Sequence, residues 1–112
     1  MKKKYTLIGI LLLLLAGCSN ITGHTYFNEN ISKIEEHLDY EDWGYLQKQA
    51  KDLKVLYDDQ QWKLQLLGDE GEYEGLNISI HRLIKAIEHE DTTRATLELA
   101  TIKVIINDIY SL

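Results

Sequence analysis

The sequence predicts an all-α protein, a small four-helix bundle of two stacked antiparallel helical hairpins behind an N-terminal lipoprotein signal helix. Apolar residues recur every three or four positions in four separate stretches, which is the spacing of one face of an α-helix. The 112-residue chain contains no proline, and its seven glycines leave long stretches uninterrupted, so helix is favoured almost throughout. The second pair of stretches also repeats the first, which predicts a duplicated hairpin.

The four apolar stripes predict four helices in chain order. The first stripe runs from Phe27 to Leu38, the second from Trp43 to Leu67, the third from Tyr73 to Ile87, and the fourth from Ala95 to Ile109. Each stripe steps by three and four residues, so its members share one helix face, which we expect to be buried. Trp43 opens the second stripe and is expected in the core.

A shift of 49 residues places the first hairpin on the second. The connectors at 39–42 and 88–91 then align, and their Glu-Asp pairs, Glu41-Asp42 and Glu90-Asp91, are identical. Each aspartate stands where the N-cap of the following helix is expected, because its carboxylate can accept hydrogen bonds from unpaired amides of the first turn. We therefore expect hairpins over about 26–67 and 73–110, within a helical domain at 26–112, and an acidic, glycine-rich linker at 68–75.

The N-terminus predicts export and lipidation. A positive head, Lys2 to Lys4, precedes an apolar run from Leu7 to Ala16. About ten apolar residues fit a signal-peptide core, whereas a spanning helix needs about 20. The stretch Leu15-Ala16-Gly17-Cys18 looks like the lipobox of bacterial lipoproteins. We expect residues 1–17 to be a signal peptide and Cys18 to carry the lipid at the head of a tether, 18–25. The alternative is a plain secretory signal with an incidental cysteine.

This segment predicts a protein held at the cell membrane by the lipid on Cys18 and facing outside the cytoplasm. Cys18 is the single cysteine, so no internal disulfide is expected. Three of the twelve Lys and Arg residues leave with the signal, so nine basic residues face 18 acidic ones. This balance argues against nucleic acid as a partner and against electrostatic docking on anionic lipid.

Four stretches carry a family resemblance: the run at 41–43, Trp62, the run at 72–76 and Ser79 to Leu83. With these residues the chain resembles a bacterial family catalogued as domain of unknown function 4363, over essentially the whole of the expected mature chain. Gly75 stands where asparagine is usual, and Asn77 where glutamate is usual. The resemblance implies a short helical protein with an N-terminal apolar anchor and no assigned activity. It also implies an accessory role, because members are often encoded beside a small multi-spanning membrane protein.

Four residues are candidates for binding a protein partner: Trp62, Leu66, Tyr45 and Arg82. Trp62 lies off the main stripe, on a second line with Leu66, and either faces a neighbouring helix or is exposed as an anchor for a partner. Arg82 has no carboxylate three or four residues away on its own helix. It is therefore solvated or pairs with another helix or another protein.

No catalytic or metal site is predicted. Ser79 and His81 are two positions apart on a predicted helix, so their side chains do not face each other. The histidines lack the spacing of a helical zinc site, and the cysteine is assigned to the lipid. We therefore predict a non-catalytic accessory or interaction module without a cofactor, bound to an integral membrane or envelope protein. The alternative is a lipoprotein that binds a small ligand or a cation.

Overall fold

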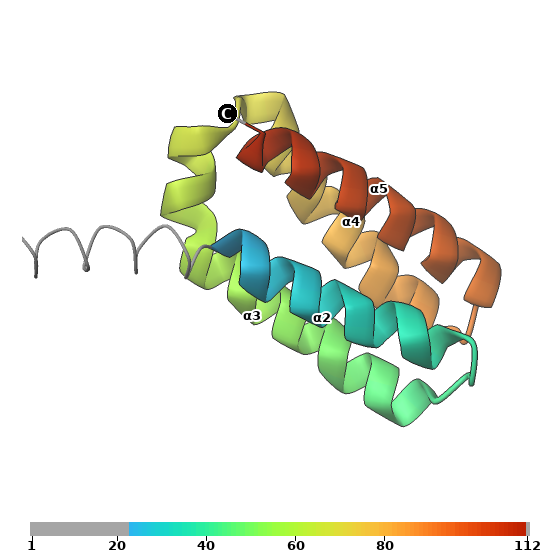
Figure 1. Cartoon of the computed structure of the whole chain (residues 1–112). Helices are drawn as coiled ribbons and strands as arrows, with labels where there is room; N and C mark the ends of the chain where they lie inside the picture. Colours follow the sequence, from blue (N-terminus) through green and yellow to red (C-terminus); the bar gives the residue numbers. More distant parts are fainter. Residues whose placement is uncertain (1–22, 112) are drawn as a thin grey trace, which may run out of the picture.

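The computed structural model describes residues 23–111, which form four α-helices and contain no strand. They are α2 (Gly23–Leu38), α3 (Trp43–Leu67), α4 (Glu70–Glu88) and α5 (Thr92–Tyr110) (Figure 1). The all-α prediction is therefore confirmed. The expected signal peptide and the lipidated Cys18 lie outside the described residues. None of the helices in 23–111 is long and apolar enough to cross a membrane.

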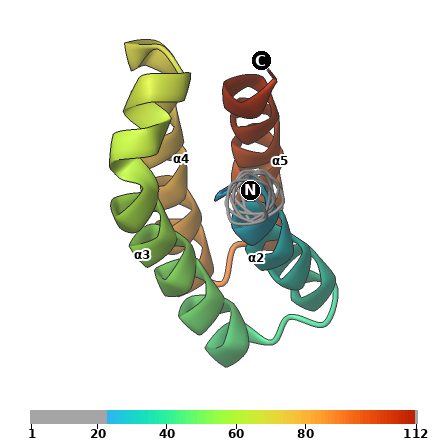
Figure 2. The same cartoon turned by 60° about the vertical axis from the view of Figure 1, so that its left-hand side comes forward.

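The helices form a closed ring in which each packs on two neighbours. The order around the ring is α2, α3, α4, α5 and back to α2, and Figure 2 shows α3 beside α4 and α2 beside α5. The α2–α3 and α4–α5 turns lie at one end of the bundle, and the α3–α4 connection lies at the other (Figure 1). We call α2 with α3 hairpin one, and α4 with α5 hairpin two.

The predicted apolar stripes form one continuous core. Its 19 buried hydrophobic residues come from all four helices. The two hairpins contribute equivalent positions: Phe27 and Leu76, Ile34 and Leu83, and Leu53 and Ile102 are all fully buried. Trp43, Leu67 and Tyr73 are partly buried and pack against this core. Burying one such side chain contributes roughly 1.5–3 kcal/mol to folding, so the shared core is what holds the two hairpins together.

The two Glu-Asp turns have the same backbone structure, which gives the 49-residue repeat a geometric basis. Glu41 and Glu90 have positive φ angles of 51° and 55°. Asp42 N–H donates to His37 O at 3.4 Å, and Asp91 N–H donates to Ala86 O at 2.9 Å. These are the bonds of a Schellman helix end, with glutamate at the left-handed position that glycine usually occupies. Each aspartate then caps the next helix, accepting from the backbone N–H three residues later.

Two helices begin earlier than the sequence predicts. The segment 68–75 was expected to be a linker, but α4 begins at Glu70. Asp69 accepts from Glu72 N–H at 2.8 Å, while the Glu72 side chain accepts from Asp69 N–H at 3.0 Å. This capping box makes the acidic residues a helix start, where negative charge is favourable. The helix α2 also extends further toward the N-terminus than predicted, since Gly23 is already helical although it falls in the expected tether at 18–25.

Candidate functional site

An exposed apolar patch lies on the last turns of α3. Trp62 is 59% exposed and Leu66 is 77% exposed. Of the two alternatives for Trp62, packing against a neighbouring helix or exposure to solvent, the structure therefore has the second. Lys63 Nζ lies 5.3 Å from the centre of the Trp62 ring, within cation–π range. We call Trp62 and Leu66 the tryptophan patch.

The tryptophan patch lies at the end of the bundle where the described chain begins. Gly23 packs directly against α3, since a Cβ atom placed on it would lie 2.8 Å from Gln60 Oε1. Trp62 and Leu66 follow Gln60 within the next two turns of α3. The patch is therefore close to the point where α2 joins the preceding segment that contains Cys18.

Tyr45 lies elsewhere. It stands in the first turn of α3, beside the α2–α3 turn, and its ring stacks on His37 with centres 3.8 Å apart. His37 Nδ1 in turn lies 2.9 Å from Lys33 O. The structure thus does not bring Tyr45 together with Trp62 and Leu66, because the two positions are at opposite ends of the long helix α3 (Figure 1).

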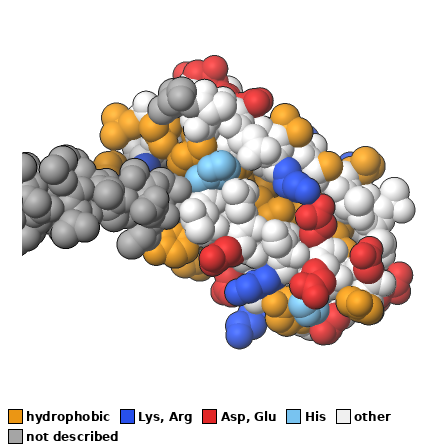
Figure 3. Space-filling view, viewed as in Figure 1, with side chains coloured by type: hydrophobic (Ala, Val, Ile, Leu, Met, Phe, Trp, Pro, Cys, Tyr) orange, Lys and Arg blue, Asp and Glu red, His pale blue; other side chains and the backbone are white. Residues whose placement is uncertain are grey.

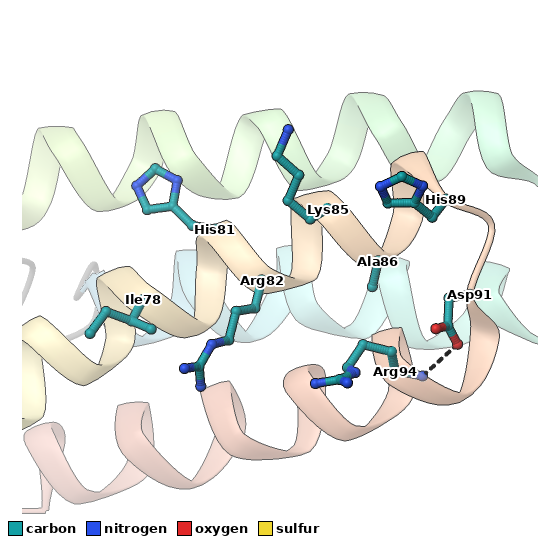
Figure 4. A pocket seen from close by; sticks show the side chains of 8 residues that line it. All are labelled: Ile78, His81, Arg82, Lys85, Ala86, His89, Asp91 and Arg94. Carbon is teal, nitrogen blue, oxygen red and sulfur yellow. Dashed lines mark hydrogen bonds between the residues drawn. The ribbon is translucent and has the colours of Figure 1, made fainter.

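Arg82 lines a groove between α4 and α5 that the sequence analysis did not identify. The groove has a volume of about 510 Å³ and is lined by Ile78, His81, Arg82, Lys85, Ala86, His89, Asp91 and Arg94. We call it the α4–α5 groove. In Figure 4 Arg82 projects from α4 toward α5, where Arg94 lies, while His81, Lys85 and His89 project from α4 toward α3. The groove therefore extends across the outer face of α4 to the beginning of α5.

The charge of the groove is mainly positive. Within 23–111, no carboxylate oxygen lies within 4.0 Å of the guanidinium nitrogens of Arg82 or Arg94. Asp91 is the acidic residue of the lining, and its carboxylate accepts a hydrogen bond from Arg94 N–H at 3.0 Å as the cap of α5. Lys85 pairs with Glu88 at 3.2 Å, but its side chain remains 72% exposed. The contrasting face, formed by α2 and α5, shows acidic and basic side chains interspersed (Figure 3).

The neighbouring positions of the two arginines, though not the groove itself, could have been predicted from the sequence. The chain contains only two arginines, Arg82 and Arg94, and both line the groove. They are 12 residues apart across a turn, a spacing that places them on facing helices of an antiparallel hairpin once the turn at 88–91 is recognised. The space itself depends on packing between the helices, so it requires the structure.

The candidate metal and catalytic residues weighed in the sequence can be located within residues 23–111. No group of three His, Cys, Asp or Glu side chains in this range is placed to hold a metal ion. Ser79 is 4% exposed in the core layer of α4, whereas His81 is exposed. His24 stacks on Tyr110 with ring centres 5.0 Å apart, at the opposite end of the bundle from the two Glu-Asp turns.

Comparison with known proteins agrees with the resemblance noted above. No curated protein and no solved structure matches the chain. A family model described as "Domain of unknown function (DUF4363)" matches residues 21–112, which include all four helices. The chain therefore belongs to the DUF4363 family.

Proposed function

We propose that this protein is a lipid-anchored accessory module that docks on an integral membrane protein outside the cytoplasm. The observation that carries the proposal is the exposure of Trp62, 59%, together with that of Leu66, 77%. Exposed tryptophan is costly in water and is enriched among residues that dominate protein interfaces. The module is non-catalytic and supplies a binding surface.

The position of the tryptophan patch supports a partner in the membrane. Five residue steps separate Cys18 from Gly23, a span of at most about 18 Å when fully extended. A lipid on Cys18 would therefore hold the first turn of α2 close to the membrane surface. The tryptophan patch lies at the same end of the bundle as this turn, because Gly23 approaches Gln60 and Trp62 follows two residues later on another face of α3. A membrane protein whose apolar surface reaches the headgroup level can contact it there.

Site-specific photo-crosslinking in native membranes tests this proposal. A photoreactive amino acid at position 62 should capture one recurrent integral membrane protein. The matched control is position 104 on α5, because Val104 has the same exposure as Trp62, 59%, and it should capture no specific protein. Capture of lipid alone, or equal capture from both positions, would contradict the docking surface. Mass spectrometry of the N-terminal peptide tests the lipid on Cys18 separately.

The alternative function, binding of a small ligand, is favoured by a different observation, the α4–α5 groove. Its volume of about 510 Å³ lies within the range of small-molecule pockets, roughly 300–1,000 Å³. The two functions are compatible, because the groove and the tryptophan patch lie on different helices.

A further inference from the structure

Hairpin one has two stacked aromatic rings at positions that align with the α4–α5 groove. The 49-residue repeat aligns Ala86 with His37 and Arg94 with Tyr45. In hairpin one the His37 and Tyr45 rings stack at 3.8 Å across the two helices. In hairpin two the aligned positions hold Ala86, which is 4% exposed, and Arg94, and both line the groove (Figure 4). The two hairpins therefore differ in residue type at the positions that line the groove.

The outer faces of the two hairpins also differ in charge. Arg82 and Lys85 align with Lys33 and Glu36, so hairpin one has a mixed face at the positions where hairpin two has two cations. The difference is marked in a chain with 18 acidic and 12 basic residues, three of the basic ones in the signal segment. The outer face of hairpin two therefore carries two neighbouring cations, Arg82 and Lys85, in a protein that is otherwise acidic.

The residue types point to an oxyanion. Arginine presents a planar fork of N–H donors that matches the oxygens of a carboxylate or phosphate, which a lysine does less specifically. Both arginines of the chain line this groove, and neither guanidinium pairs with a carboxylate within 23–111. Ile78, 49% exposed, supplies an apolar surface beside them.

We propose that the α4–α5 groove binds a small organic anion, with a carboxylate or phosphate held between Arg82 and Arg94 and an apolar body against Ile78. The volume of about 510 Å³ accommodates a ring or a short chain together with the charged group. This inference does not depend on the lipid anchor or on the tryptophan patch.

Isothermal titration calorimetry on the full chain, reconstituted in nanodiscs of zwitterionic lipid, tests the proposal with phenyl phosphate as the probe. Phenyl phosphate should bind, and inorganic phosphate should bind more weakly because it lacks the apolar body. Arg82→Gln and Arg94→Gln should each weaken binding by about tenfold or more, since each removes a charge-assisted hydrogen bond. Higher salt should also weaken it.

Matched variants from hairpin one provide the controls. Lys33→Gln removes one charge at the position equivalent to Arg82 and should change the affinity by less than about twofold. The double variant Ala86→His and Arg94→Tyr copies the stacked pair of hairpin one and should abolish binding, with helix content checked by circular dichroism. Absence of binding, or equal losses in Lys33→Gln and Arg82→Gln, would overturn the proposal. Tight binding of poly-glutamate without binding of phenyl phosphate would also overturn it, in favour of an acidic protein segment.

Discussion

Hairpin one and hairpin two share a turn and a core but differ on their outer faces. The shared features are those that determine the backbone: equivalent buried positions, the left-handed glutamates at 41 and 90, and the capping aspartates. The different features are those that face a ligand or solvent. In one hairpin His37 and Tyr45 form a stacked pair, and in the other the aligned residues Ala86 and Arg94 line the α4–α5 groove. A repeated unit can therefore keep its fold in both copies while the residues on its outer faces differ.

The largest expected effect comes from the shared core. Ile34 and Leu83 are equivalent and both are 0% exposed, so Ile34→Ala and Leu83→Ala should each lower the free energy of unfolding by about 3 kcal/mol. Chemical denaturation followed by circular dichroism measures this. If the hairpins form one core, each variant should unfold in one cooperative transition, and the two losses of free energy should be similar. Two separate transitions, or a loss of stability in only one variant, would contradict the equivalence of Ile34 and Leu83.

Most of the fold could be predicted from the sequence because the buried stripes and the caps are local patterns. The spacing of apolar residues places the four helices, and the repeated Glu-Asp pair locates both turns. The start of α4 was missed because the glycines at 68, 71 and 75 suggest a linker, whereas the reciprocal bonds of Asp69 and Glu72 form a capping box. The left-handed glutamates were also missed, since this conformation is normally a position for glycine.

The candidate sites were less predictable for a physical reason. The exposure of Trp62 depends on whether another helix covers the second line of α3, and helical spacing alone does not determine this. The α4–α5 groove depends on how the side chains of α4 and the beginning of α5 pack. Helical spacing predicts which residues are exposed but not the space between them, so the structure is needed to identify the groove.

The capping aspartates are expected to have the next largest effect. Asp42→Ala and Asp91→Ala should each lower the free energy of unfolding by about 1 kcal/mol, because the amide at the start of the next helix loses its acceptor. The cap bond from Arg94 N–H to Asp91 is 3.0 Å, whereas the bond from Tyr45 N–H to Asp42 is 3.4 Å. We therefore expect Asp91→Ala to have the larger effect of the two. A larger effect of Asp42→Ala in thermal unfolding would contradict this ranking.

A buried hydroxyl distinguishes the cores of the two hairpins. Tyr57 is 3% exposed and its hydroxyl donates to Tyr73 O at 3.1 Å, whereas the equivalent residue of hairpin two is Ile106. Burial raises the pKa of the Tyr57 hydroxyl above 10.0, and the nearby Asp58, Tyr73 and Glu74 raise it further. The folded state therefore retains the proton more strongly than the unfolded state.

The consequence is a loss of stability at high pH. Below about pH 10, the pKa of an unfolded tyrosine, Tyr57 makes its full contribution to the free energy of unfolding. This contribution is lost as the pH rises through the higher pKa of the folded state. Burial also raises the pKa of Tyr110, so this residue adds to the same trend. At pH 8, Tyr57→Phe should cost about 1 kcal/mol for the lost hydrogen bond. Urea denaturation measures the difference in free energy of unfolding between the variant and the wild type, and this difference should be smaller at pH 11 than at pH 8. An equal difference at both pH values would contradict this explanation.

The smallest expected effect is a gain in stability from the turns themselves. Glu41 and Glu90 adopt φ angles of 51° and 55°, a left-handed conformation that costs a residue with a Cβ atom about 1–2 kcal/mol. Glycine removes this cost but makes the unfolded chain more flexible. The net effect of Glu41→Gly or Glu90→Gly should therefore be a stabilisation of about 0.5 kcal/mol. Because the two turns have the same hydrogen bonds, the gains measured by thermal unfolding should be nearly equal. Destabilisation in one hairpin only would mean that its glutamate side chain makes a stabilising contact, for which the bond from Thr92 Oγ1 to Glu41 Oε1 at 3.5 Å is the first candidate.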